Sequence, residues 1–152
     1  MILQFEDIFG LTVKSVRPEL CPGRRVDQLR ADAKLLADER PFLAVCLGQQ
    51  ALCHELGIPL AYKDIVFQGT QSPVELDGGV ENVGFYNTFV GRVRHDAPEG
   101  VTVETDPDTG DVHLVRGPHF RGIQFHAESI LTEQGFLLLR DLLLDLLAPD
   151  GG

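Results

Sequence analysis

The chain has 152 residues and carries 13 Lys and Arg against 23 Asp and Glu, for a formal net charge of −10. Hydrophobic residues make up 43% and charged residues 24%, a balance typical of one globular domain and not of low-complexity disorder. Because the chain is acidic and has no basic stripe, we expect no nucleic-acid partner, and because no apolar run reaches the roughly 18 residues of a membrane span, we expect no membrane partner.

Strands and helices are predicted to alternate over the first third of the chain. Leu11–Val16 alternates apolar and polar residues, which is the period of a half-buried strand. Apolar residues at helical spacing then predict a helix over Val26–Ala37. The unbroken apolar run Phe42–Val45 predicts a strand that is buried on both faces. A second helix is predicted over Gln49–Leu56, where Gly57 follows.

Strands and turns are predicted to follow, and then a further helix. Val101–Thr105 and Val112–Val115 flank the turn-forming residues Asp106–Gly110, so these two runs predict a β-hairpin. Ile123–Phe125 predicts a last short strand. Thr132 is predicted to cap the final helix with its hydroxyl. The apolar face of this helix is predicted to include Phe136, Leu139, Leu143 and Leu146.

A cysteine stands where the buried strand passes directly into a helix. Cys46 ends the strand, Leu47-Gly48 is predicted as a sharp turn, and the helix begins at once. This arrangement is typical of a nucleophile elbow, because it lifts a side chain out of the sheet beside a helix N-terminus, whose partial positive charge favours a thiolate. The backbone N–H of Leu47 can face a developing oxyanion. The alternative is a buried structural cysteine at a strand end.

A histidine and a glutamate stand two residues apart at the end of the last predicted strand. His126 ends that strand, and Glu128 follows. In extended backbone, residues i and i+2 project to the same face, so the carboxylate can accept the imidazole N–H and leave the other nitrogen for a thiol. The alternative is a solvated pair at a strand end. Together with Cys46, the pair supplies the nucleophile, the base and the orienting group of thiol catalysis.

The remaining candidate residues are interpreted as structural or solvated. Cys53 and His54 lie on the helix after Cys46, but no second ligand pair has metal-site spacing, so no metal is expected. His113 and His119 flank a Gly-Pro turn and are predicted at the surface. Three cysteines do not make a disulfide framework, which favours a reducing, cytoplasmic setting. A solvated basic face is assigned to Arg92, Arg94 and His95, and a packing role to Phe85 and Tyr86.

Two segments that carry the candidate residues resemble a known family. CLGQQAL and QFHAES place Cys46 and His126 80 residues apart, and they resemble the two signatures of the class I (triad) glutamine amidotransferases. The resemblance runs from about Arg40 to Leu147. Within the family, ERPFLAVCLG, VGFYNTF and Gln68-Gly69 are most similar to the amidotransferase domain of anthranilate synthase and to its phenazine-pathway relative, 2-amino-2-desoxyisochorismate synthase.

The resemblance implies an α/β fold of flavodoxin-like type, with a mostly parallel sheet, flanking helices and a β-hairpin insertion. It implies that Cys46 attacks the carboxamide of glutamine, that His126 takes the thiol proton and passes it to the departing ammonia, and that Glu128 orients His126. The product is a γ-glutamyl thioester that water hydrolyses to glutamate, with no cofactor in this domain. The ammonia passes to a chorismate-binding synthase domain or subunit.

The resemblance also assigns the residues around the triad. Leu47 supplies one oxyanion N–H, and Gly48 lets the elbow turn tightly. Gln50 matches the family glutamine that helps to bind the substrate. Thr88 and Phe89 match the segment whose backbone holds the amino-acid end of the substrate.

The chain departs from the family pattern chiefly in its first residues. We expect one partial domain over residues 1–152 in which residues 1–25 are degenerate, because the family's first strand is absent and its third strand is deleted. Cys21-Pro22-Gly23 looks like a shortened remnant of the Gly-Pro-Gly loop, so Gly23 is a candidate for the second oxyanion donor. Two smaller departures are Gln49, where the family usually has His or Met, and Ala127 in place of Pro. We expect these two to tune function.

Three functions follow from these observations. The leading one is a glutamine-hydrolysing amidotransferase domain that supplies ammonia to an anthranilate-synthase-like or phenazine-pathway enzyme. The second is a catalytically impaired remnant that binds or stabilises such a synthase, which the shortened loop favours. The third is a thiol hydrolase of the same fold that acts on another γ-glutamyl or peptide substrate, whereas Gln50 and the Tyr86–Phe89 segment favour glutamine.

Overall fold

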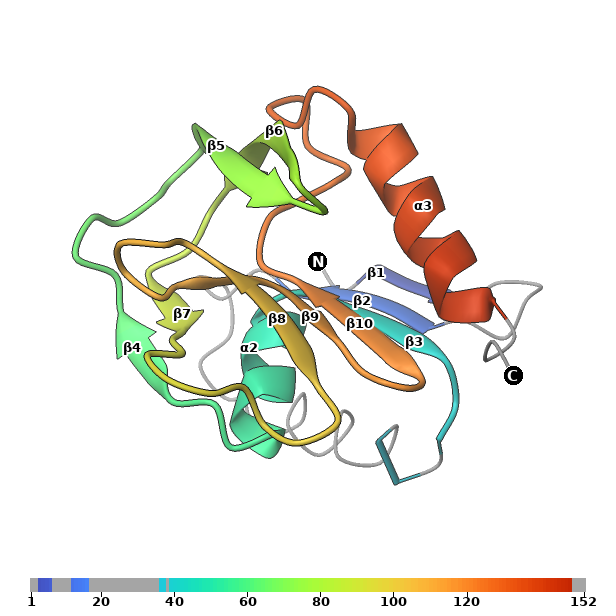
Figure 1. Cartoon of the computed structure of the whole chain (residues 1–152). Helices are drawn as coiled ribbons and strands as arrows, with labels where there is room; N and C mark the ends of the chain where they lie inside the picture. The colour runs from blue at the N-terminus through green and yellow to red at the C-terminus, as the bar shows by residue number, and fades with distance from the viewer. Residues whose placement is uncertain (1–2, 7–11, 17–35, 38, 149–152) are drawn as a thin grey trace.

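A six-stranded sheet lies at the centre of the computed structural model, which describes residues 3–6, 12–16, 36–37 and 39–148 (Figure 1). In spatial order its strands are β1 (Leu3–Glu6), β2 (Thr12–Val16), β3 (Phe42–Cys46), β10 (Phe120–Ile123), β9 (Val112–Arg116) and β8 (Thr102–Thr105). The middle strands β2, β3 and β10 are parallel, whereas β1, β9 and β8 each pair antiparallel with a neighbour. The α/β class that the sequence predicts is confirmed.

The two faces of the sheet are covered by different elements. Every residue of β3 is buried, and successive side chains of a strand point to opposite faces. Phe42 and Ala44 therefore pack in one core with helix α2 (Leu47–Glu55). Leu43 and Val45 pack in a second core with helix α3 (Gly135–Leu147) and with the hairpin of β5 (Thr70–Leu76) and β6 (Gly79–Phe85). Figure 1 shows α3 and this hairpin above the sheet and α2 below it.

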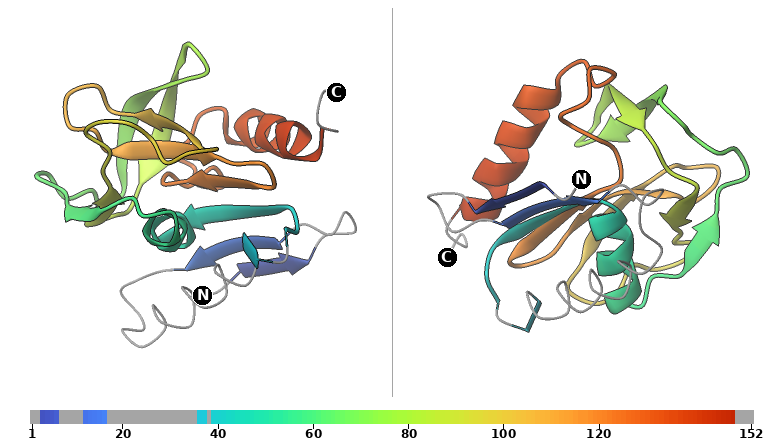
Figure 2. Two further views of the ribbon diagram at one scale, coloured as in Figure 1. Left: turned by 60° about the horizontal axis from the view of Figure 1, so that its bottom comes forward. Right: turned by 180° about the vertical axis from the view of Figure 1, so that it is seen from behind.

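The remaining strands flank the sheet on the side of α2. β4 (Leu60–Tyr62) and β7 (Phe89–Gly91) form a short antiparallel pair that contacts α2 (Figure 2). Their pairing places Tyr62 beside Phe89, with ring centroids 4.3 Å apart. β7 follows the hairpin directly. This pair therefore places Phe89 beside the first turn of α2, where Phe89 contacts Gln50.

Most predicted elements are found, with corrected bounds. The strand over Leu11–Val16 is β2, the buried run is β3, and β8 and β9 form the predicted hairpin. Leu47-Gly48 is helical, so the predicted turn there is wrong; β3 ends at Cys46 and α2 begins at the next residue, with no loop between them. The last strand ends at Ile123, because the backbone bends at Gln124 and Phe125.

The final helix differs from its prediction in its cap and its buried face. Thr132 does not cap α3, whose N-cap position is Gln134; the Thr132 hydroxyl instead binds the backbone of His126. Phe136 is 79% exposed, whereas Leu142 is buried, so the buried face of α3 does not include its first turn at Phe136. No helix of the part that the structure describes combines the length and the apolar character of a membrane span.

The first residues add a strand that the sequence did not predict. β1 lies at the edge of the sheet, antiparallel to β2, whereas we expected no strand before Leu11. Of the helix predicted over Val26–Ala37, only Leu36 and Ala37 are described, and both are helical. The Cys21–Gly23 loop remnant and the place where we expected the third strand to be deleted lie outside the described residues.

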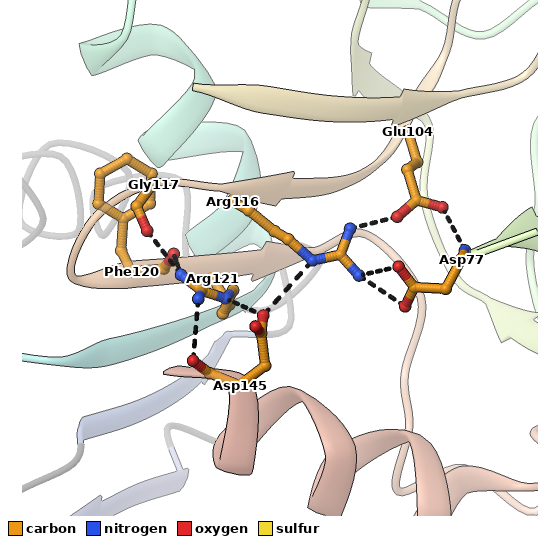
Figure 3. Close-up of polar contacts among 7 residues, drawn as sticks. All are labelled: Asp77, Glu104, Arg116, Gly117, Phe120, Arg121 and Asp145. Atoms are coloured by element: carbon orange, nitrogen blue, oxygen red, sulfur yellow. Dashed lines mark hydrogen bonds and ion pairs between the residues drawn. The ribbon is translucent and has the colours of Figure 1, made fainter. Parts of the chain in front are cut away.

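An arginine ties the hairpin to the sheet and to α3. Nη2 of Arg116 on β9 donates to both carboxylate oxygens of Asp77 in the β5–β6 turn, at 2.8 and 2.7 Å, and Nη1 donates to Glu104 on β8 (Figure 3). Asp145 of α3 lies 3.6 Å from Arg116 Nε and 2.8 Å from Nε of Arg121 on β10. The hairpin is thereby anchored at its turn.

Candidate active site

Cys46 lies at the junction of β3 and α2 in a strained backbone conformation. Its φ of 55° and ψ of −107° place it in a region that costs a non-glycine residue about 1–3 kcal/mol. α2 begins at the next residue, Leu47, and the N–H groups of a helix's first turn have no intrahelical acceptor. At the N-cap position, the Cys46 side chain makes no capping hydrogen bond to α2. The backbone therefore has the geometry of a nucleophile elbow, with Leu47 and Gly48 as the first donors of the helix.

His126 lies in the loop after β10, and the β5–β6 hairpin fixes its backbone. The N–H of His126 donates to the carbonyl of Gly84 at 2.9 Å. The Thr132 hydroxyl donates to the carbonyl of His126 at 2.6 Å and accepts from the N–H of Gly84 at 3.0 Å. The Tyr86 ring stands edge-on to the imidazole, with centroids 5.3 Å apart. The position of the imidazole is thus set by the end of β6.

The imidazole of His126 joins Glu128 to Cys46. Its Nδ1 lies 2.6 Å from Oε1 of Glu128. Ala127 and Glu128 form a turn, so this contact does not arise from the extended backbone that we assumed from the sequence. Burial lowers the pKa of His126, but hydrogen bonds to the Cys46 sulfur and the Glu128 carboxylate, together with their charges, raise it to about 10. The imidazole is therefore protonated at neutral pH.

Two glutamine side chains link Cys46 to the segment after the hairpin. Gln50 Nε2 donates to the carbonyl of Phe89 at 2.8 Å and to Oε1 of Gln124 at 3.0 Å. Gln124 Nε2 in turn donates to Sγ of Cys46 at 3.5 Å. Gln124 was not a candidate in the sequence. The signal that could have found it is an uncharged polar residue in an apolar run, two positions before His126.

The segment proposed to hold the substrate is already engaged within the protein. The carbonyl of Thr88 accepts from the N–H of Lys63 at 2.9 Å. The carbonyl of Phe89 accepts from both Gln50 and Asn87, each at 2.8 Å. Phe89 therefore lies beside Gln50, and the carbonyls of Thr88 and Phe89 are both occupied within the protein. Gly23 lies outside the described residues.

Three residues predicted at the surface are buried or half-buried, so those expectations are wrong. His113 on β9 is 7% exposed and packs on Phe85 with ring centroids 5.6 Å apart, and burial lowers its pKa. His119 is half-buried beside Phe120. The side chain of Arg92 is 11% exposed and pairs with Asp111 at 2.8 Å. Hydrophobic neighbours and a buried carboxylate account for these positions.

The second described cysteine has none of these features. Cys53 on α2 is fully buried in the core below the sheet. Burial raises the pKa of its thiol to about 12, so this thiol stays protonated at neutral pH. Among the described residues, no group of three or more His, Cys, Asp or Glu side chains is placed to hold a metal ion.

Comparisons with known proteins agree with the fold and with the two signature segments. The sequence profile of the family described as "Glutamine amidotransferase class-I" matches residues 21–146. The chain is 48% identical over 114 residues to a phenazine-specific anthranilate synthase of Pseudomonas chlororaphis and 38% identical over 110 residues to anthranilate synthase component II of Haloarcula marismortui. These matches cover 72% and 64% of this chain but 18% and 57% of the relatives.

A solved structure shares the fold. A glutamine amidotransferase from Thermotoga maritima superimposes with a TM-score of 0.60 at 19% sequence identity, over 89% of this chain and 64% of that chain. At this identity the match concerns the fold alone. The chain spans less than two thirds of the length of each of these three proteins.

Proposed function

Because the chain belongs to the class-I glutamine amidotransferase family, we propose that it hydrolyses glutamine to glutamate and ammonia with Cys46 as the nucleophile. The observation that carries this proposal is the arrangement of the Cys46, His126 and Glu128 side chains. The Cys46 sulfur, at an elbow, raises the pKa of the His126 imidazole, and Nδ1 of that imidazole lies 2.6 Å from the Glu128 carboxylate. These are the three roles that thiol catalysis needs.

The first half of the reaction forms a thioester. The thiolate of Cys46 attacks the carboxamide carbon of glutamine, and a C–S bond forms. The negative charge that develops on the carboxamide oxygen faces the N–H groups at the start of α2, beginning with Leu47, which have no acceptor within the helix. The C–N bond then breaks, and the imidazolium of His126 gives its proton to the nitrogen, which leaves as ammonia.

The second half of the reaction regenerates the thiolate. The now neutral His126 takes a proton from water as the oxygen attacks the γ-glutamyl thioester. The C–S bond breaks, glutamate leaves, and the thiolate and imidazolium are restored. Glu128 keeps Nδ1 of His126 occupied, so that Nε2 serves the sulfur in both halves. This chemistry needs no cofactor.

Gln50 is the residue best placed to bind the amino-acid end of glutamine. Both hydrogens of its Nε2 donate within the protein, to Phe89 and Gln124. Its Oε1 has no hydrogen-bond partner among the described residues, and a carbonyl oxygen is an acceptor for an ammonium group. We therefore assign Gln50 Oε1 to the α-ammonium of the substrate.

We infer that the ammonia passes to a chorismate-binding synthase domain or subunit. The support is that the relatives named above are anthranilate synthases, one of them a much longer chain. Large apolar side chains are also exposed in loops that lead to or from the site, namely Ile65 at 72% and Ile130 at 97%. A partner surface would cover them. The cytoplasmic setting and the lack of nucleic-acid and membrane partners stay predictions from the sequence.

Replacement of the nucleophile tests the proposed function. Cys46→Ser should abolish ammonia release from glutamine while the far-ultraviolet circular dichroism stays that of the parent chain. Cys53→Ala is the matched control, because burial keeps that thiol protonated, and it should retain ammonia release. Release by Cys46→Ser at the parent rate would contradict the assignment of the triad.

The alternative function is that of a catalytically impaired subunit that binds or stabilises a synthase. One structural observation favours it, because the Cys46 side chain has no exposed surface. Under this alternative the parent chain releases no ammonia, and its Cys46 stays closed to small thiol reagents in the folded state. The same ammonia assay on the parent chain, with thiol alkylation beside it, distinguishes the two functions.

A further inference from the structure

A fully buried amide touches the reacting sulfur, and no role in the chemistry above is assigned to it. Gln124 is 0% exposed, and its Nε2 lies 3.5 Å from Sγ of Cys46. Its backbone N–H is bound to the carbonyl of His113 at 3.0 Å, so the residue is held at both ends. Burying an amide is costly unless its polar atoms are paired, and here one of the pairs is the nucleophile.

The orientation of this amide follows from a chain of contacts that begins at a backbone carbonyl. The oxygen of Phe89 can only accept, so the group of Gln50 that faces it is the NH₂. The second hydrogen of that NH₂ points to Gln124, which must present its own oxygen. The NH₂ of Gln124 is thereby turned toward the sulfur. A donor in this position stabilises the charged form of the thiol over the neutral form.

We propose that Gln124 is a further catalytic residue, which holds Cys46 as a thiolate through its Nε2 hydrogen bond, and that Gln50 is a positioning residue that fixes the orientation of the Gln124 amide. This inference deepens the proposed function and rests on it for the identity of the nucleophile. The sulfur then has the amide of Gln124 as a donor beside the imidazolium of His126.

The test compares two isosteric replacements of buried glutamines. Gln124→Met removes the donor and keeps the length of the side chain. Gln49→Met is the matched control, because Gln49 is also 0% exposed and its side-chain hydrogen bond goes to the carbonyl of Val112 at 3.4 Å instead of to Cys46. The readout is the second-order rate of Cys46 alkylation by iodoacetamide between pH 5 and 9, with the adduct located by mass spectrometry.

We expect Gln124→Met to slow Cys46 alkylation at neutral pH by about 10- to 100-fold, which is the value of a hydrogen bond to a charged group. Gln49→Met should stay within about threefold of the parent chain, because it leaves the sulfur untouched. Equal rates for Gln124→Met and the parent chain, or equal losses in both variants, would overturn the proposal. Equal losses would mean that replacing any buried glutamine in this core slows Cys46 alkylation, whether or not its amide contacts the sulfur.

A second variant and a second readout keep the test decisive. If Gln124→Met does not fold, Gln124→Asn withdraws the same amide by one methylene and should give the same loss. The pKa of His126, about 10 in the parent chain, should fall in either variant because its thiolate partner becomes less stable, as followed by imidazole NMR shifts. An unchanged His126 titration would contradict the proposal. None of these readouts needs glutamine turnover, so they can succeed even where the proposed glutaminase activity fails.

Discussion

His126 lies between two groups that both favour its protonated form. The Cys46 sulfur and the Glu128 carboxylate overcome the effect of burial and raise its pKa from 6.5 to about 10. A group whose pKa is higher in the folded than in the unfolded state stabilises the fold at low pH. The contribution of His126 is therefore fully present below pH 6.5 and is lost as the pH rises toward about 10.

Glu128→Gln tests this arrangement. We expect the pKa of His126 to fall, the alkaline loss of stability to shrink, and glutamine hydrolysis to slow by at least about tenfold, because the imidazole loses its orienting carboxylate. The measurements are imidazole NMR titration, urea unfolding at pH 6.5 and pH 10, and ammonia release. Glu133→Gln is the control, because Glu133 binds Asn82 instead of His126. A parent-like titration in Glu128→Gln would contradict the account.

The sequence singled out these candidate side chains but did not predict their geometry. Cys46, His126 and Glu128 stand out because a thiol, an imidazole and a carboxylate occur at two abrupt strand ends. His126 and Glu128 were expected to share one face of a strand. That expectation was wrong, because a turn and not a strand joins them. Gln124 was missed, because a polar residue next to Ile123 and Phe125 in an apparent strand reads as solvent-facing, whereas the bend buries it.

At the scale of elements, the β5–β6 hairpin holds the loop after β10 that carries His126, and we call this contact the clamp. Its far end is Gly84, whose backbone binds both His126 and Thr132. A side chain at Gly84 would place a Cβ 2.8 Å from Cβ of Leu131 and 3.1 Å from Oγ of Ser129. The glycine therefore allows the close approach that sets the imidazole.

We expect Gly84→Ala to move the loop after His126 and to slow glutamine hydrolysis by up to about 100-fold, since small displacements of catalytic groups have effects of this size. Its circular dichroism should resemble that of the parent chain. Gly79→Ala at the other end of β6 is the control, because its Cβ would meet only the carbonyl oxygen of Leu76 at 3.7 Å. Full activity in Gly84→Ala, or equal losses in both variants, would argue against the clamp.

The turn of the hairpin depends on Arg116. Arg116→Met removes the ion pair with Asp77 and the contact with Glu104, so we expect a loss of about 1–2 kcal/mol in the free energy of unfolding, smaller at high salt. Arg140→Met is the matched control, since Arg140 is half exposed and pairs with its neighbour Asp141; it should change stability by less than about 0.5 kcal/mol. Urea unfolding at low and high salt measures both. A salt-independent loss in Arg116→Met would show that the network is not electrostatic.

This hairpin shows what the sequence could and could not predict of the elements. Asp77-Gly78 has positive φ at both residues and is a strong hairpin signal that we did not use. The β8–β9 hairpin was predicted, because its turn residues are flanked by clear apolar alternation. β1 could not be predicted, because its four residues form a strand only by pairing with β2.

At the scale of the whole molecule, the site is assembled from segments far apart in the sequence. Cys46 comes from the parallel centre of the sheet, His126 from the loop after β10, and Gln50 from α2. β3 and β10 are parallel neighbours, so their carboxyl ends lie at the same edge of the sheet. Sites at this edge are typical of α/β sheets with parallel strands. Once the strands are known, the sequence predicts that the site lies at this edge of the sheet. It does not predict which side chains contact one another there.

The central claim is that Cys46 is a glutamine-directed nucleophile in this chain. The most direct test is labelling with a glutamine-mimicking electrophile, followed by location of the adduct by mass spectrometry. The account predicts an adduct on Cys46 alone, blocked by excess glutamine. No adduct on Cys46 in the folded chain, with the same thiol reacting freely after mild unfolding, would contradict it and leave the binding subunit as the function.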